Sequence, residues 1–166
     1  MVFRAPISDG ETNRMTRDRD VRNAIQAALV ATGAFDPNSV WIWGLPEDYG
    51  TGASSFAAAA IEPGGSQQSD EWDDTSIGAL NVKSSVLITL LYRHEDPQLR
   101  DEAVELLFDT AANALNGQCF AGITLPGFTK FRRWDWCQAD PPERRIRAIF
   151  EYMYLVEGWN EYDVTP

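Results

Sequence analysis

Histidine, cysteine and long apolar runs are all scarce in this sequence. The 166 residues include one histidine and two cysteines, Cys119 and Cys137. The cysteines lack CxxC spacing and have no histidine nearby in the sequence, so we expect reduced thiols rather than a zinc site, with a single bridge between them left open. No signal-peptide pattern and no run of about 18 apolar residues occurs, so we expect a soluble protein made in the cytoplasm, without a membrane partner.

Basic residues are missing from a long central stretch. No lysine or arginine lies between Asn23 and Val82, and the whole chain carries a formal charge of -11. This acidity argues against nucleic-acid binding as the main function, because phosphate binding needs a basic face. The central acids are Asp36, Glu47, Asp48, Glu62, Asp70, Glu71, Asp73 and Asp74, whereas arginines gather near both ends, at Arg14, Arg17, Arg19, Arg22, Arg132, Arg133, Arg144, Arg145 and Arg147. We predict that the acidic region of one copy faces the basic region of the next.

The length and the hydrophobic share of 44% are those of one ordinary domain. We therefore assign residues 1–166 to a single unit. We expect a flexible N-terminal arm over about residues 1–15 and a long mobile loop over about residues 62–78, whose polar sequence "EPGGSQQSDEWDDTS" begins at Glu62.

Two segments have the periodicity of amphipathic helices. Residues 16–33 place Val21, Ile25 and Leu29 on one face, with Thr16 as the expected N-cap. Residues 96–117 begin with an Asp-Pro pair and end with Asn-Gly, and their apolar stripe is Val104, Leu107, Phe108, Ala111 and Leu115. Both helices should cover one side of a sheet.

Five segments are predicted to be strands. Residues 39–45 and 55–61 are short, and residues 79–95 alternate clearly, with an apolar face and a largely wet face. Residues 127–136 and 144–159 flank the turn "ADPPE" and form a hairpin. The order α-β-β-β-α-β-β predicts an α+β fold: a mainly antiparallel sheet of about five strands with two helices packed on one face.

Catalytic and cofactor motifs are weak. His94 could serve as a base, but no GxSxG elbow supplies a nucleophile, and a surface histidine before a helix is the simpler interpretation. "GTGASS" lacks the lysine of a phosphate loop. The acids Asp70 to Asp74 lack EF-hand order, so we expect a solvated loop and no cofactor, with a weak divalent cation site as the alternative.

Tryptophan is more informative than the acids. Trp41 and Trp43, and likewise Trp134 and Trp136, have the spacing that places both rings of a pair on one face of a strand. Such faces fill a core or bind partners, where tryptophan is enriched. The interface candidates are therefore Asp70, Glu71, Trp72, Asp73, Asp74, Arg132, Arg133, Trp134, Trp136, Arg144, Arg145 and Arg147.

The order of elements, together with "WIWG" after the first helix and "VLITLLYRHEDP" before the second, resembles the tail terminator proteins of long-tailed bacteriophages. The resemblance covers the chain from "RDRDVRNAIQAAL" to "IFEYMYLVEGW". It implies a non-enzymatic virion protein at the head-proximal end of the tail. It also implies a homohexameric ring that ends tail-tube polymerisation and joins the head.

The same resemblance implies its partners. They are other copies of the chain, the tail tube protein and a head-completion or neck protein, with DNA passing through the lumen. Trp72, held in solvent by its acidic neighbours, is then predicted to insert into the tube or a neighbouring subunit on assembly. A different head-to-tail connector, neck or tail-completion subunit is the alternative within this class. A small hydrolase or ligand-binding α+β domain that uses His94 is the alternative outside it.

Overall fold

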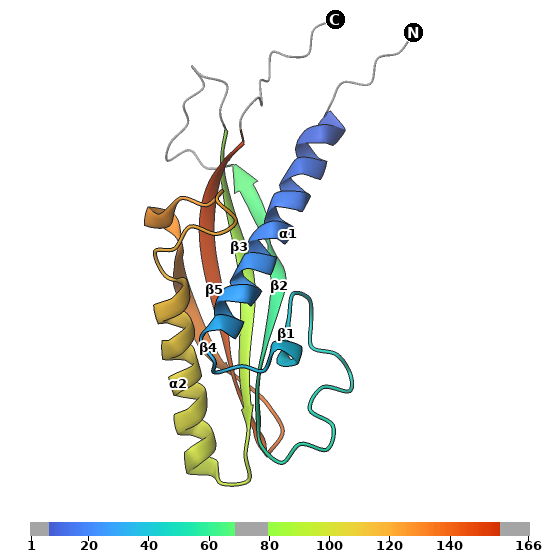
Figure 1. Ribbon diagram of the computed structural model, residues 1–166, viewed down its shortest axis with the longest axis vertical. Helices are drawn as coiled ribbons and strands as arrows, with labels where there is room; N and C mark the ends of the chain where they lie inside the picture. The colour runs from blue at the N-terminus through green and yellow to red at the C-terminus, as the bar shows by residue number, and fades with distance from the viewer. Residues whose placement is uncertain (1–6, 69–79, 157–166) are drawn as a thin grey trace, which may run out of the picture.

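The computed structural model describes residues 7–68 and 80–156. Helices α1 (Ile7–Ala31) and α2 (Pro97–Leu115) lie on one face of a five-stranded sheet (Figure 1). The strands are β1 (Val40–Trp41), β2 (Phe56–Gln68), β3 (Leu80–Arg93), β4 (Lys130–Cys137) and β5 (Glu143–Val156), in the spatial order β1-β2-β3-β5-β4. The predicted α+β class and element order are confirmed, although β1 pairs with β2 in parallel.

Helix α1 is longer than the sequence pattern indicated. It begins at Ile7, so the predicted N-cap Thr16 is wrong, and much of the expected arm over residues 1–15 is helical. Helix α2 agrees closely with its prediction. The carboxylate of Asp96 accepts hydrogen bonds from the backbone N–H groups of Gln98 and Leu99, and Pro97 occupies the first turn, where a missing N–H costs nothing.

The long loop predicted over residues 62–78 is partly strand. Residues 62–68 continue β2 and pair with β3, with a bulge between Pro63 and Gly65. A Cβ on Gly64 would lie 2.7 Å from the carbonyl oxygen of Ser85, so the two backbones approach too closely for any other residue. Residues 69–79, which include the remainder of the predicted loop, lie outside the described residues.

Strand β1 is only two residues long, which changes the first tryptophan pair. The ring of Trp41 lies 6.5 Å from that of Tyr49, whereas Trp43 lies beyond the strand and under the guanidinium of Arg22 in α1. The prediction that both rings share one strand face is therefore wrong for this pair, because strand alternation stops at Trp41.

A bulge also alters the alternation in β4. The register with β5 shifts between Phe131 and Arg133, so Phe131 and Trp134 both lie on the helix-covered face. Simple alternation had grouped Phe131 with Arg133 and Asp135. A bulge adds one residue to a strand and reverses the facing of everything after it.

The core lies between the sheet and the two helices. Val21, Ile25 and Leu29 of α1 are buried together with Val104, Leu107, Ala111 and Leu115 of α2. The sheet contributes Ala59, Ile61, Val82, Val86, Ile88, Leu90, Phe150, Tyr152 and Tyr154. These residues alternate along their strands, as a sheet with one packed face requires.

The opposite face of the sheet carries no helix, and we call it the helix-free face. Its expected wet character is only partly correct, because Thr89 and Leu91 are buried there. The loop of residues 42–55 lies beside the end of the sheet that contains Thr89 and Leu91 (Figure 1). There the ring of Tyr49 contacts that of Phe56, and the guanidinium of Arg93 donates a hydrogen bond to the carbonyl of Gly50. The other end of the face stays more open, and Ile149 is 37% exposed.

Candidate assembly surfaces

Trp134 and Trp136 form an exposed aromatic pair on β4, the strand at the edge of the sheet. They are 48% and 38% exposed, and their ring centroids are 6.3 Å apart. Phe108 of α2 lies 5.6 Å from Trp134, so the indole is held on one side and open on the other. The bulge therefore leaves two large aromatic side chains half in solvent, which is typical of a contact surface.

Arg144 belongs to the same edge. Its guanidinium lies 4.6 Å from the ring centroid of Trp136, and its Nε lies 3.4 Å from a carboxylate oxygen of Asp101 in α2. The side chain thus joins β5, β4 and α2 on the helix-covered face. Because these contacts are within one copy, Arg144 is held by its own domain.

The other two arginines of this cluster point the opposite way. The register places Arg145 and Arg147 on the helix-free face, beside Cys137 and Asp135 of β4. The predicted interface arginines therefore do not form one patch. Strand alternation separates residue 144 from residues 145 and 147, which the sequence already implied.

The helix-free face is basic although the chain is acidic. Seven basic side chains, Lys83, Arg93, Lys130, Arg132, Arg133, Arg145 and Arg147, occupy it or its rim. Four acidic side chains, Glu62, Asp135, Glu143 and Glu151, share it. Glu151 pairs with both Lys83 and Arg132, and Arg133 pairs with Asp135 at 2.9 Å. Among the described residues no ion pair holds Arg147.

A polar cluster fastens the loop of residues 42–55 to this face. The hydroxyl of Tyr49 donates to the carboxylate of Glu143 and accepts from Arg145, while Arg93 lies 3.7 Å from Glu143. Burial raises the pKa of Tyr49, and the hydrogen bond and negative charge of Glu143 raise it further, while Arg145 opposes them. Arg145 is therefore largely committed to its own domain.

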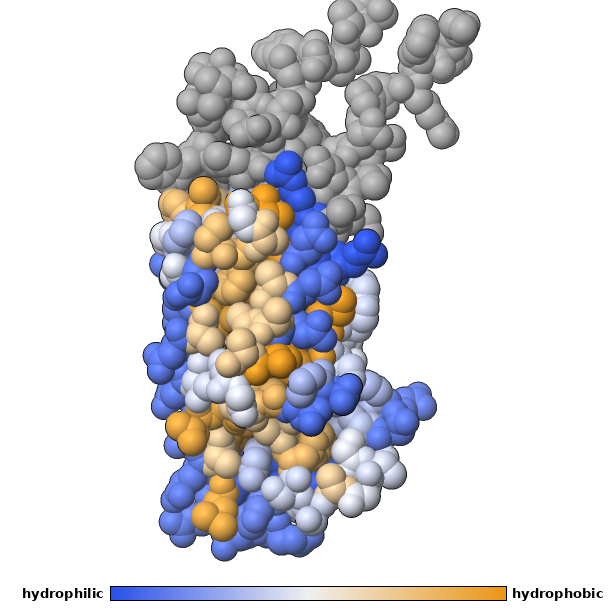
Figure 2. All heavy atoms as spheres, viewed as in Figure 1, coloured by the Kyte–Doolittle hydropathy of each residue, from blue (hydrophilic) through white to orange (hydrophobic). Residues whose placement is uncertain are grey.

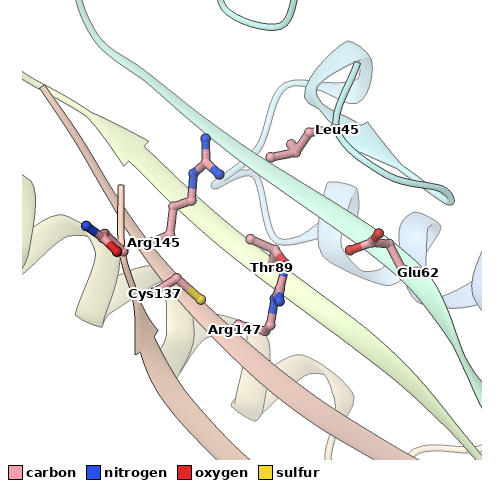
Figure 3. A pocket seen from close by; sticks show the side chains of 7 residues that line it. Leu45, Glu62, Thr89, Cys137, Arg145 and Arg147 are labelled. Atoms are coloured by element: carbon pink, nitrogen blue, oxygen red, sulfur yellow. The ribbon is translucent and has the colours of Figure 1, made fainter. Parts of the chain in front are cut away.

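Beside that cluster the face is hollowed (Figure 3). The hollow has a volume of about 450 Å³ and is lined by Leu45, Glu62, Thr89, Cys137, Gln138, Arg145 and Arg147. Glu62 of β2 and the arginines of β5 stand on either side of Thr89. The hydroxyl of Thr89 has no hydrogen-bond partner among the described residues. The hollow has a basic wall and an acidic wall, so it does not define one charge class of ligand.

Several predicted site residues are not tested by this geometry. Asp70, Glu71, Trp72, Asp73 and Asp74 lie outside the described residues. No group of three or more metal-ligating side chains occurs within residues 7–68 and 80–156. Cys119 and Cys137 are both unpaired thiols.

His94 contacts the turn that precedes α2. Its Nδ1 accepts the backbone N–H of Asp96 at 3.0 Å, and its ring lies 6.4 Å from that of Tyr92. The imidazole therefore lines the turn that leads into α2.

None of the described helices is long and apolar enough to span a membrane.

Sequence reasoning missed one surface, the outer face of α2. Leu99 and Leu106 are 51% and 66% exposed, and the acids Glu102, Glu105 and Asp109 are exposed on the same side of the helix. The signal was present, because these two leucines fall outside the apolar stripe that the helix buries. In Figure 2 small orange areas interrupt the blue surface along α2.

Comparison with solved structures finds a virion protein of similar fold. A chain from the virion of a native gene transfer agent particle superposes with a TM-score of 0.50 and 16% sequence identity. The match covers 82% of this chain and 98% of that chain. The two share a fold. No protein-family model and no curated protein sequence matches.

Proposed function

We propose that this protein is a structural component of a phage-like virion that closes a homohexameric ring on the tail tube. The observation that carries the proposal is the fold shared with the virion chain, which spans almost all of that chain. In this role the ring ends tube polymerisation at the head-proximal end and offers a surface to a head-completion or neck protein. Its lumen passes DNA, and no cofactor takes part.

The surfaces of the domain suit repeated contacts between copies. One face of the sheet is covered by helices and the other is not. An uncovered sheet face is commonly buried by another layer of structure. The uncovered face is basic, whereas the chain as a whole has a charge of -11. Opposite charges on different faces of one molecule favour a head-to-tail contact, which closes into a ring when the rotation allows.

The β4 edge supplies the aromatic part of the proposed interface. Trp134 and Trp136 are large, half-exposed and held by neighbours, so little side-chain entropy is lost when a partner covers them. Arg132 and Arg133 on the same strand are exposed and provide charge at its rim. The segment Asp70 to Asp74, with Trp72, remains a proposed anchor for the tube or a neighbouring subunit.

Particle size tests the ring directly. Light scattering and negative-stain imaging across a concentration series, with and without magnesium, should show closed rings of one fixed size. Trp134→Ala should reduce the ring fraction while leaving the fold intact, and Phe56→Leu, a change beneath the loop of residues 42–55, serves as a control away from that edge. Open, variable-length chains or unspecific aggregates would contradict ring closure.

A further inference from the structure

We propose that the outer face of α2 in one copy packs on the helix-free face of the next copy. This inference rests on the proposed ring and names the surfaces that meet in it. The partner is a second copy of this chain. The acidic side of the contact is α2, rather than the acidic segment that precedes β2.

The receiving surface has an apolar centre and a basic surround. Leu87 and Ile149 lie opposite each other on β3 and β5, and Ile149 is substantially exposed. Arg133 pairs in register with Ile149, and Arg147 lies one step along the same face. Arg147 has no ion-pair partner within the described part of the chain, so its charge is open to a carboxylate from outside.

The outer face of α2 also has an apolar centre, but the residues around that centre are acidic. Leu99 and Leu106 are spaced two helical turns apart, and Glu105 and Asp109 lie beside them on the exposed side. Within residues 7–68 and 80–156 neither Glu105 nor Asp109 forms an ion pair. Two exposed leucines flanked by unpaired acids therefore match an exposed isoleucine flanked by arginines.

The relative position of the two surfaces on the domain determines the kind of assembly that their contact forms. Helix α2 covers one face of the sheet, so its outer side and the helix-free face lie on opposite sides of the domain (Figure 1). A surface on the front that binds a surface on the back is heterologous, and such contacts repeat from copy to copy. Six such contacts close the proposed ring when each one turns the next copy by about 60°.

The acidic segment before β2 is a poorer partner. Asp36, Glu47 and Asp48 are exposed, and Trp43, which lies under the guanidinium of Arg22, is 55% exposed. That segment therefore offers one exposed aromatic ring, whereas α2 offers two exposed leucines two helical turns apart with acids beside them. Buried apolar area, more than rim charge, holds an interface together.

A charge-exchange experiment on the full chain tests the contact. Glu105→Arg with Asp109→Arg makes α2 basic, and Arg133→Glu with Arg147→Glu makes the sheet face acidic. The self-association affinity of each double variant alone should be lower than that of the wild type by more than about tenfold, because like charges then meet in every contact. An equimolar mixture should recover assembly, since each contact again joins opposite charges.

The matched control is Glu47→Arg with Asp48→Arg, which changes the net charge by the same amount elsewhere. It should assemble as the wild type does, measured by light scattering at low salt. If this control lost assembly and regained it on mixing with the Arg133→Glu, Arg147→Glu variant, the α2 contact would be overturned while the ring itself survived.

The apolar centre is tested separately. Leu106→Ser removes an exposed leucine and should weaken self-association with unchanged unfolding, whereas Glu102→Gln, a neighbouring exposed change, should have a smaller effect. Normal assembly by Leu106→Ser would overturn the inference. A wild-type protein that stayed monomeric up to about millimolar concentration would also overturn a contact between copies, since specific interfaces bind far more tightly than that; tube capping would then test the proposed function independently.

Discussion

The guanidinium of Arg144 lies over the ring of Trp136, while Arg147, three residues later, faces the other side of the sheet without an ion-pair partner among the described residues. Two arginines of one strand thus have different surroundings. Arg144 stabilises the edge of its own domain, and Arg147 is available to another molecule.

Arg144→Ala should lower the free energy of unfolding by about 1 kcal/mol, because the change removes a cation–π contact and a partly exposed ion pair with Asp101. Arg147→Ala should change it by less than about 0.5 kcal/mol. Urea unfolding followed by tryptophan fluorescence measures both. Equal losses for the two variants would show that Arg147 has a partner within its own copy.

Gly64→Ala should destabilise the protein by about 1–3 kcal/mol, because the new Cβ would lie 2.7 Å from the Ser85 carbonyl oxygen in the neighbouring strand. Gly127→Ala is the control, since nothing lies within 4 Å of its Cβ position. Thermal unfolding compares the two. A Gly64→Ala protein as stable as the Gly127→Ala protein would mean that β2 and β3 can separate at the bulge without cost.

Phe150→Ala should cost about 3–5 kcal/mol, because its ring is fully buried between Phe120 and Phe131. Trp134→Ala removes a larger side chain but should cost much less, since almost half of Trp134 is already exposed. Its effect should instead be on assembly. Chemical denaturation ranks the two, and the reverse order would place Trp134 in the core.

Tyr152 should make the protein sensitive to alkali. Burial raises the pKa of Tyr152, the nearby carboxylate of Asp18 adds to the shift, and the hydroxyl donates to that carboxylate at 2.9 Å. The folded state therefore keeps this proton when the unfolded chain, with an ordinary pKa of about 10, loses it. Stability from this group is complete below about pH 10 and declines as the pH rises further.

Tyr152→Phe separates the hydrogen bond from the titration. The variant should be less stable by about 1 kcal/mol near neutral pH, where the bond is lost. Its stability should then fall less steeply than that of the wild type above about pH 10. Denaturant unfolding at both pH values gives the two differences. Parallel curves would show that Tyr152 ionises equally well in the folded and unfolded states.

The sequence predicted most of the fold because its helices and long strands have clear periods. The Asp-Pro start of α2 and the alternation of β3 both identify their elements locally. The extent of α1 before Thr16 was not predictable from the apolar face of Val21, Ile25 and Leu29, and the second half of β2, residues 62–68, was hidden by its glycines and Pro63. Propensity disfavours that strand, and pairing with β3 overrides it.

The interface was less predictable than the fold. The spacing of Trp134 and Trp136 correctly places both rings together, but the bulge that faces them toward α2 depends on pairing with β5. Whether a leucine such as Leu106 is exposed depends on what packs around the helix. Charge runs in the sequence grouped Arg144 with Arg147, whereas strand alternation places them on opposite faces of the sheet.

Capping of tail tubes tests the central proposal most directly. Purified protein would be added to growing tail tubes of a phage-like particle, and tube lengths and ends would be measured by electron microscopy. The proposal predicts that tubes stop growing and that a ring of this protein sits at one end of each. Tubes that continue to lengthen in excess protein, with bare ends, would contradict it.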